Sequence, residues 1–448
     1  MEPHLPADPL SRRPAIPDRD AFRPESPRDR VAVDGPCVRS RDRARAGLYL
    51  HVPFCASRCT YCDFSSGERS AVAVERWFAA LEREVARRAP DAAELRFSSV
   101  FFGGGTPSAI PARRFTQVWN LLAAHFTIEP DAEITLEANP ESVRPALLEA
   151  WASAGVNRLS MGAQSFDPDE LRLLGRVHPA ERPPEAVALA REFGFERLSL
   201  DLMYGFPGHT QTTWEQSVER ALGCDIEHLS AYCFIPEPGT PLGDASLAGR
   251  AQLPEPEMQA DLYAWLTERT ARAGLGAYET SNFCRPLAEA RHNLVYWLRR
   301  PYVGLGPSAH GLVHGERYGN HYALAHWADS LERGGSGEAE REGETAESRT
   351  EETIMLALRL GTGLRFADLD RAGRAEIERK YSGAFDAACA LGRLETTRGG
   401  VRVPPRLRFM ADDVIAWIEA RVAGTRVDSA RADRIIPSPC PSLPFPAI

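Results

Sequence analysis

Long apolar runs are missing from this sequence of 448 residues. No stretch reaches the roughly 18 to 20 consecutive apolar residues that a membrane-spanning helix needs, and the N-terminal segment lacks the apolar core of a signal peptide. A hydrophobic content of 43% is nevertheless enough to bury a large core. The sequence therefore predicts a cytoplasmic protein with no membrane span of its own.

Concentrated positive charge is also missing. The formal net charge is -9, and acidic and basic residues are interspersed along the chain, unlike the basic stripe that binds nucleic acid. The nine cysteines are odd in number, and three of them fall within eight positions. This usage favours a metal site in a reducing compartment over a disulfide framework. We expect no nucleic-acid partner.

Apolar periodicity is lacking in three segments. Residues 1–46 are rich in Pro and Arg, and residues 426–448 end in PSPCPSLPFPAI, so neither buries enough surface to offset its ordering entropy. Residues 334–352 are rich in Gly and Glu, which predicts an acidic linker or exposed loop. We expect disordered termini, a large domain over 47–333 and a small domain over 353–425.

The large domain has a regular alternation of patterns. Six short runs of β-branched or aromatic residues, from GLYLHVP to EHLSAYC, alternate with stretches of helical periodicity such as Ala71–Arg88. Strands that are each followed by a helix predict βα units on a parallel sheet, with functional residues at the carboxyl ends of the strands. The predicted fold class is therefore α/β.

The small C-terminal domain shows helical periodicity in Thr353–Leu360 and Phe409–Ile418, and a hairpin-like pattern over Leu394–Val403. This order resembles a small winged-helix domain. Winged helices often bind DNA, but this segment has no concentrated basic face, so we expect a packing or lid role.

The motif HVPFCASRCTYCDF places Cys55, Cys59 and Cys62 just after the first predicted strand. Three thiolates can hold three irons of a [4Fe-4S] cluster and leave the fourth iron open for another ligand. A zinc site or three unrelated buried thiols are the alternatives. Zinc sites usually have a fourth Cys or His at short spacing, and none follows closely here.

Further motifs follow the cysteines in order: FFGGGTP, TLEANP, SMGAQSF, LGRVH and LSLDLMYGFPG. Together with the cysteine motif, they make the chain from Gly47 to Ile418 resemble the radical S-adenosylmethionine (SAM) superfamily. Within it, the sequence resembles the family of oxygen-independent coproporphyrinogen III oxidases and HemW-type heme chaperones. The resemblance implies a partial (β/α)6 barrel, a [4Fe-4S] cluster on the three cysteines and a bound SAM.

The resemblance also implies which residues contact SAM. In the glycine turn they are Gly104, Gly105 and Thr106. Because the two glycines have no side chain, the backbone can approach a ligand closely there. Carboxylates can accept hydrogen bonds from ribose hydroxyls or an amine, and an arginine suits a carboxylate. Each polar residue taken alone is better explained as a capping or loop residue, and it is their joint order that favours SAM. The remaining implied contacts are Tyr49, Tyr61, Glu137, Gln164, Arg176 and Asp201.

Two functions share this framework: oxidative decarboxylation of coproporphyrinogen III by a 5′-deoxyadenosyl radical, and the binding and delivery of heme. Oxidases resembling this chain have another cysteine two positions after the third, where this chain has Phe64. Residues 292–297 read HNLVYW, which fits the HNxxYW signature of the heme-chaperone branch. Both features favour the chaperone, with no catalytic residue assigned. Cleavage of SAM on an unknown substrate is left open by the sequence. A nucleic-acid-modifying radical SAM enzyme is a third alternative.

A chaperone of this kind implies heme, heme-accepting proteins and an electron donor as partners, and leaves a homodimer open. His292 offers an imidazole nitrogen for heme iron, and Tyr296 and Trp297 offer flat faces for the macrocycle. The alternative is a histidine hydrogen-bonded in the core beside two packing aromatics. Four histidines that follow are further candidate donors: His310, His314, His321 and His326.

Overall fold

A computed structural model describes residues 45–424 of the chain. The two segments expected to be disordered lie outside these residues, except that Arg45 and Ala46 already belong to the first strand. The boundary expected at residue 47 therefore moves two positions towards the N-terminus.

The described residues build one sheet of 12 strands. Six neighbouring strands in it are parallel and follow one another in chain order. They are β1 (Arg45–Val52), β4 (Arg96–Gly104), β5 (Ile128–Ala138), β6 (Arg158–Gln164), β7 (Arg197–Tyr204) and β8 (His228–Cys233). Each overlaps one of the six runs predicted from the sequence, and the α/β fold class is confirmed.

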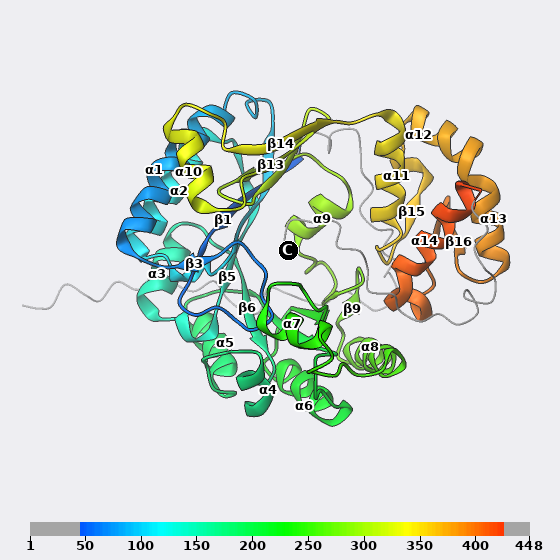
Figure 1. Cartoon of the computed structure of the whole chain (residues 1–448), viewed down its shortest axis with the longest axis horizontal. Helices are drawn as coiled ribbons and strands as arrows, with labels where there is room; N and C mark the ends of the chain where they lie inside the picture. The colour runs from blue at the N-terminus through cyan, green and yellow to red at the C-terminus, as the bar shows by residue number, and fades with distance from the viewer. Residues whose placement is uncertain (1–44, 425–448) are drawn as a thin grey trace, which may run out of the picture. The chain divides into compact units, whose positions relative to one another are not determined.

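Helices connect the parallel strands and cover the outside of the sheet, as Figure 1 shows. They are α1 (Ala71–Arg88), α2 (Ala112–His125), α3 (Pro145–Ser153), α4 (Pro168–Leu173), α5 (Arg182–Glu192) and α6 (Gln211–Leu222). Two further helices, α7 (Pro241–Leu247) and α8 (Pro256–Arg272), follow β8. The arrangement is that of a partial (β/α)6 barrel, in which the carboxyl ends of the strands form one rim.

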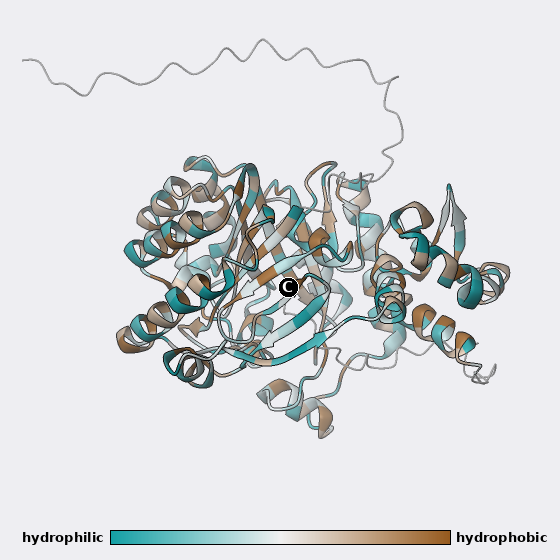
Figure 2. Cartoon of the chain, turned by 90° about the horizontal axis from the view of Figure 1, so that it is seen from above, coloured by the Kyte–Doolittle hydropathy of each residue, from teal (hydrophilic) through white to brown (hydrophobic). Residues whose placement is uncertain are grey.

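Helix α1 illustrates why these segments are helical. The Ser70 side chain accepts a hydrogen bond from Ala73 N (3.1 Å) and caps the first turn. Trp77, Leu81 and Val85 follow at four-residue intervals and are fully buried against the sheet. Figure 2 shows the same two-sidedness in the outer helices, which are brown on one side and teal on the other.

The sheet continues beyond the parallel strands on both sides. Next to β8 lie β10 (Asn282–Cys284) and β9 (Gly276–Ala277), both antiparallel to their neighbours. Next to β1 lies the parallel strand β11 (Tyr302–Leu305). Three antiparallel strands complete this side: β12 (His310–Val313), β13 (Glu316–Asn320) and β14 (Glu338–Gly343).

The segment 334–352 was expected to be a linker or exposed loop, and the structure corrects this. Residues Glu338–Gly343 form β14, and α11 (Ala346–Ala357) begins soon afterwards. The segment lacks an apolar face because β14 is an edge strand that pairs only with β13 and leaves most of its side chains exposed. A pattern search for buried residues therefore misses it.

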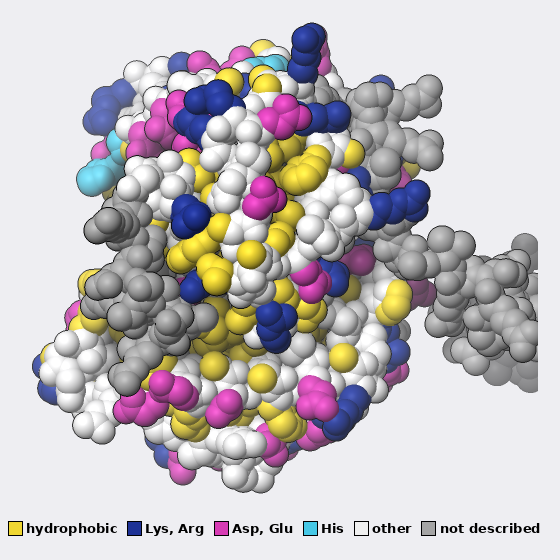
Figure 3. Space-filling model, turned by 90° about the vertical axis from the view of Figure 1, so that its right-hand side faces the viewer, with side chains coloured by type: hydrophobic (Ala, Val, Ile, Leu, Met, Phe, Trp, Pro, Cys, Tyr) yellow, Lys and Arg dark blue, Asp and Glu magenta, His cyan; other side chains and the backbone are white. Residues whose placement is uncertain are grey.

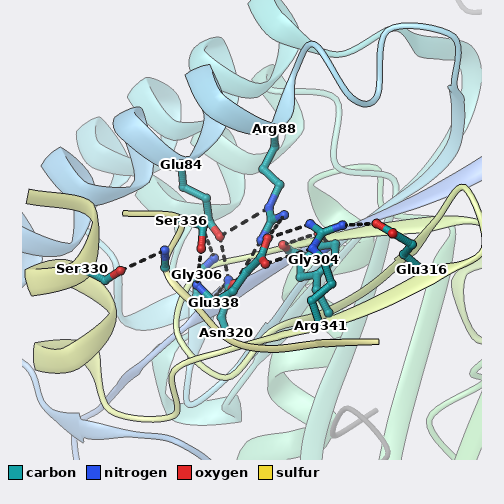
Figure 4. A network of polar contacts seen from close by, with 12 residues as sticks. Glu84, Arg88, Gly304, Gly306, Glu316, Asn320, Ser330, Ser336, Glu338 and Arg341 are labelled. Carbon is teal, nitrogen blue, oxygen red and sulfur yellow. Dashed lines mark hydrogen bonds and ion pairs between the residues drawn. The ribbon is translucent and has the colours of Figure 1, made fainter. Parts of the chain in front are cut away.

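A buried polar network connects the segment from β11 to β14 with α1 (Figure 4). Glu84 Oε2 accepts a hydrogen bond from Gly306 N (2.7 Å), and its Oε1 accepts one from Asn320 Nδ2 (2.6 Å). Arg88, one turn later, donates to Glu338 Oε1 of β14 (2.6 Å). Burial raises the pKa of the Glu84 carboxyl to about 7, and Arg88 offsets part of that effect.

The C-terminal residues form a second core around side chains such as Tyr381, Phe385 and Ile418. It packs on the barrel where the Tyr263 and Phe409 rings lie 5.3 Å apart. It contains a three-stranded sheet and several helices. Besides α11, the elements are β15 (Leu364–Arg365), α12 (Arg371–Glu376), a π-helix (Ile377–Tyr381), α13 (Ser382–Ala390), β16 (Glu395–Thr397), β17 (Gly400–Arg402) and α14 (Ala411–Val422).

Basic side chains of this domain have acidic partners nearby. Lys380 pairs with Glu347 and with Glu376, and Arg402 pairs with Glu395. Figure 3, which turns the right-hand side of Figure 1 to the viewer, shows Lys and Arg side chains scattered among Asp and Glu. The charge on this face is therefore neutralised locally.

Candidate functional site

The three cysteines follow the carboxyl end of β1, and all three are half-buried. Cys55 ends the short strand β2 (Phe54–Cys55), and Cys59 and Cys62 lie on the loop after it. Other rim segments hold the loop in place. Thr60 N donates to Leu174 O, just after α4 (3.2 Å), and Leu242 N of α7 donates to Thr60 O (2.8 Å). The cysteine loop is thus shaped by contacts from segments that come much later in the sequence.

Charge and hydrogen bonding link the three sulfurs to their surroundings. Burial, with smaller effects from Cys59 and Cys55, raises the pKa of the Cys62 thiol to about 12. Thr106 Oγ1 donates to Cys55 Sγ (3.4 Å), and an Arg176 guanidinium N–H donates to Cys59 Sγ (3.3 Å). Within residues 45–424, no three ligand-type side chains already surround a common point.

The donor set nevertheless fits an iron-sulfur cluster. Three cysteines on one short loop supply three thiolates, and hydrogen bonds to sulfur from outside the loop are what tunes such a cluster. The other described cysteines, at 224, 233, 284 and 389, lie elsewhere along the chain. Three protein thiolates leave one iron of a four-iron cluster open for another ligand.

The glycine turn at the end of β4 reaches the cysteine loop directly. A Cβ added to Gly105 would lie 2.8 Å from Phe54 O and 3.0 Å from Cys55 Sγ, so only glycine allows this approach. Gly104 has φ +110°, and its added Cβ would lie 2.7 Å from the His51 ring. Gly104 N donates to Glu137 Oε2 (3.2 Å) on the next strand.

Four of the predicted polar residues line the rim beside this turn. All are partly exposed, so their side chains reach accessible space and are not sealed in the core. Burial raises the pKa of the Glu137 carboxyl to about 8, and repulsion from Asp201 adds to the effect. Burial also raises the pKa of Asp201, against hydrogen bonds from Ser230 and Ser160. The four are Glu137, Gln164, Arg176 and Asp201.

Arg176 is the residue that joins these strand ends to the cysteine loop. Besides Cys59, its guanidinium donates to Gly162 O (2.7 Å) at the end of β6 and to Asn139 Oδ1 (2.8 Å) after β5. Gln164 lies beside it with φ +65°, a backbone conformation that few non-glycine residues adopt. A strained residue at a strand end is typical of functional sites.

The two predicted tyrosines have different positions. Tyr61 lies inside the cysteine loop, half-buried, and packs against a rim cluster that includes Leu174 and Phe206. Tyr49 is only 3% exposed and lies below the glycine turn, where its hydroxyl bonds to His51 Nδ1 (3.1 Å). Tyr49 therefore supports the rim from inside the barrel.

His292 lies deeper still, at the amino ends of the strands. Its Nδ1 bonds to Ser99 Oγ (2.9 Å) and its Nε2 bonds to Tyr296 Oη (2.9 Å). The ring is 1% exposed, and burial lowers its pKa to about 3. Of the two roles left open by the sequence, this arrangement favours the core histidine, because both ring nitrogens have hydrogen-bond partners.

Sequence reasoning missed two residues that complete the site. Asn139 bridges Arg176 and Thr106, to which its Nδ2 donates (3.3 Å). His51 supports Gly104, and its Nε2 bonds to Ser65 O (2.8 Å). Both were detectable as polar residues two positions after Glu137 and Tyr49: His51 lies on the same face of β1 as Tyr49, and Asn139 directly follows β5.

Comparison with known proteins agrees with this geometry. The sequence profile of the radical SAM superfamily matches residues 49–221. "Heme chaperone HemW" of Mycobacterium tuberculosis is 36% identical over 372 residues, which is 82% of this chain and 93% of that protein. The Bacillus subtilis protein of the same name is 35% identical over 324 residues, 71% of this chain and 86% of that protein.

The chain belongs to the HemW family of radical SAM proteins. The [4Fe-4S] cluster and SAM are the cofactors of this superfamily. In this HemW-family chain, no helix within residues 45–424 is long and apolar enough to cross a membrane.

Among solved structures, "Coproporphyrinogen III oxidase (HemN) from Escherichia coli" has the same fold. It superposes with a TM-score of 0.74, at 21% identity, over 85% of this chain and 92% of that one. At this identity the likeness establishes the fold of the HemW-family chain alone.

Proposed function

We propose that this protein is a heme chaperone, which binds heme and transfers it to recipient proteins. The observation that carries the proposal is the similarity to "Heme chaperone HemW" over 93% of that protein. Phe64, where a coproporphyrinogen oxidase would have another cysteine, supports the same choice. The proposal includes a cluster on Cys55, Cys59 and Cys62, and a SAM site at the rim.

In this proposal, different residues of the rim contact different parts of SAM. Arg176 is the cation for the methionine carboxylate, and Glu137 and Asp201 accept hydrogen bonds from the amine or the ribose hydroxyls. Backbone groups of the glycine turn, Gly104 to Thr106, approach the methionine end. The remaining contacts come from Tyr61 and Gln164, and Tyr49 acts from below.

The chemistry that a bound cluster and SAM can supply is reductive cleavage of the sulfonium C–S bond. The protein's own contribution is to orient the ligand and exclude water. Glu137 and Asp201 lie near enough for their charges to repel, so a cationic amine between them would lower both pKa values. Deprotonation of Glu137 should therefore favour SAM binding as the pH rises towards about 8, where an α-amine itself begins to lose its charge.

The experiment that tests the proposal uses the whole chain, reconstituted without oxygen. We expect saturable binding of hemin in an absorption titration. In parallel, the protein is incubated with coproporphyrinogen III, SAM and a reductant. Hemin binding with no decarboxylated product supports the chaperone, whereas formation of protoporphyrinogen would establish the oxidase, whose fold this chain shares.

We further propose that the protein acts in the cytoplasm, with an electron donor and heme-accepting proteins as partners. A reducing compartment keeps the three cysteines available for iron. Fractionation of cells followed by detection of the protein checks the compartment, and size-exclusion chromatography with and without hemin checks for a homodimer. Recovery of the protein only with membranes would contradict the cytoplasmic assignment.

A further inference from the structure

The described histidines differ in whether they can bind a metal. His51, His228 and His292 are buried, and each engages both ring nitrogens in hydrogen bonds. His321 is half-buried and His326 is exposed, and their ring centres lie 6.3 Å apart. In the part of the chain that the structure describes, the ring nitrogens of these two histidines have no hydrogen-bond partner.

The two histidines flank an exposed tyrosine at the end of β13 and the start of α10 (Leu324–Glu332). Tyr322 is 57% exposed. The next helix directs Trp327 into the core, which leaves His326 on its outer side. We call the group His321, Tyr322 and His326 the histidine rim.

The histidine rim adjoins the cysteine loop. The Tyr322 hydroxyl donates to Asp63 O (2.5 Å), and the Tyr322 carbonyl accepts from Ser65 Oγ (2.5 Å). Asp63 directly follows Cys62. Burial raises the pKa of the Tyr322 hydroxyl, and the charges of Asp63 and Cys62 add to that effect. The histidine rim therefore lies near the carboxyl ends of the strands, whereas His292 lies near their amino ends.

We propose that heme docks on the histidine rim, with the His321 and His326 pair supplying the imidazole that ligates the iron. The inference rests on the proposed chaperone function, since it names where the cargo binds. Histidine is a common axial ligand of heme iron, and the exposed Tyr322 ring offers a flat apolar face to the porphyrin. Arg58, exposed on the cysteine loop and close enough to act on Tyr322, supplies a cation for a propionate.

Accessibility is the reason for choosing this pair over His292. Heme that is handed to another protein has to bind where the recipient can reach it. Ligation by His292 would require breaking two buried hydrogen bonds and opening the floor of the barrel. Ligation by His321 or His326 breaks no ring hydrogen bond within the described residues.

The test compares the unsubstituted full chain with the double variant His321→Ala/His326→Ala in hemin titrations followed by absorption. We expect at least a tenfold weaker affinity and a changed Soret band in the double variant. A matched control is His125→Ala/His314→Asn, which alters two other exposed histidines and should keep the affinity within twofold. Asn is chosen at position 314 because His314 has φ +55°.

The outcomes separate the inference from the function on which it rests. If the unsubstituted chain does not bind hemin saturably, the chaperone proposal fails. If it binds hemin and the double variant binds equally well, the rim assignment is overturned. Thermal unfolding shows whether each variant is folded, and the single variant His326→Ala replaces the double variant if the latter is not.

Discussion

A single backbone conformation at Gly104 brings the β4 turn to the cysteine loop. Its positive φ and its contact with the His51 ring exclude a side chain. The same turn presents Gly104 N to Glu137. The position therefore links backbone strain to the geometry of the rim.

We expect Gly104→Ala to lower the free energy of unfolding by roughly 1 to 3 kcal/mol, the usual cost of a sparsely populated conformation. Denaturant unfolding measures the change. Gly383→Ala is the matched control, because no atom lies within 4 Å of its added Cβ, and it should be neutral or stabilise by up to about 1 kcal/mol. Equal effects of the two substitutions would contradict the argument.

Glu84 should make stability depend on pH. Its pKa in the folded chain is about 7, above the ordinary 4.5, so the folded state holds the proton more tightly. The resulting stabilisation is complete below about pH 4.5 and is lost as the pH rises through about 7. Glu84→Gln, which does not titrate, should therefore give a flatter stability profile between about pH 5 and 7.5.

Chemical unfolding at a series of pH values checks this expectation. Glu82→Gln, an exposed substitution on the same helix, is the control and should leave the profile unchanged. Glu84→Gln should also lower stability by about 1 to 3 kcal/mol, because its amide nitrogen would face a donor, Gly306 N or Asn320 Nδ2. An unchanged pH profile in Glu84→Gln would rule out the titration of this carboxyl.

At the scale of elements, α9 (Arg291–Trp297) closes the amino end of the barrel. Its first turn is held by Glu133 Oε1, which accepts a hydrogen bond from His292 N (3.1 Å). The His292 ring then bonds to Ser99 of β4. The motif HNLVYW thus fastens a short helix to two strands.

We expect Tyr296→Phe to lower the free energy of unfolding by about 1 to 3 kcal/mol, because it leaves His292 Nε2 buried without a partner. Hemin affinity should stay unchanged, because Tyr296 is not part of the histidine rim proposed to bind heme. Unfolding and hemin titrations on the same preparation measure both effects. A loss of hemin affinity without a loss of stability would restore His292 as the heme ligand.

The elements differ in how far the sequence predicts them. Helix α1 was predicted over Ala71–Arg88, because its periodicity and cap are local. Strand β14 was not, because its order comes from pairing with β13 and from Arg88 on α1, 250 residues away in sequence. Polar edge strands carry little apolar signal of their own.

The same distinction holds for the site. The three cysteines and the glycine turn are local motifs, and the structure brings them together as expected. The packing of His292 depends on Ser99 and Glu133, which lie 193 and 159 positions away. Residue type and local spacing could not decide between a ligand and a core residue there.

At the scale of the whole molecule, the cysteine loop stands outside the hydrophobic core that holds the barrel together. We expect Cys55→Ala, Cys59→Ala and Cys62→Ala each to lose iron on anaerobic reconstitution while the apoprotein stays folded. Cys224→Ala and Cys389→Ala are the controls and should retain iron. Iron assay and circular dichroism check this, and iron retained in the first three variants would contradict the assignment.

The anchors of the cysteine loop also set an order of events during synthesis. Thr60 bonds to a residue 113 positions later, and Ser65 and Asp63 bond to Tyr322, which is 257 and 259 positions later. A ribosome delivers the cysteines long before these partners exist. If the cluster binds at these cysteines, we therefore expect iron and sulfide to enter after synthesis, into a loop that a nearly finished barrel has already shaped.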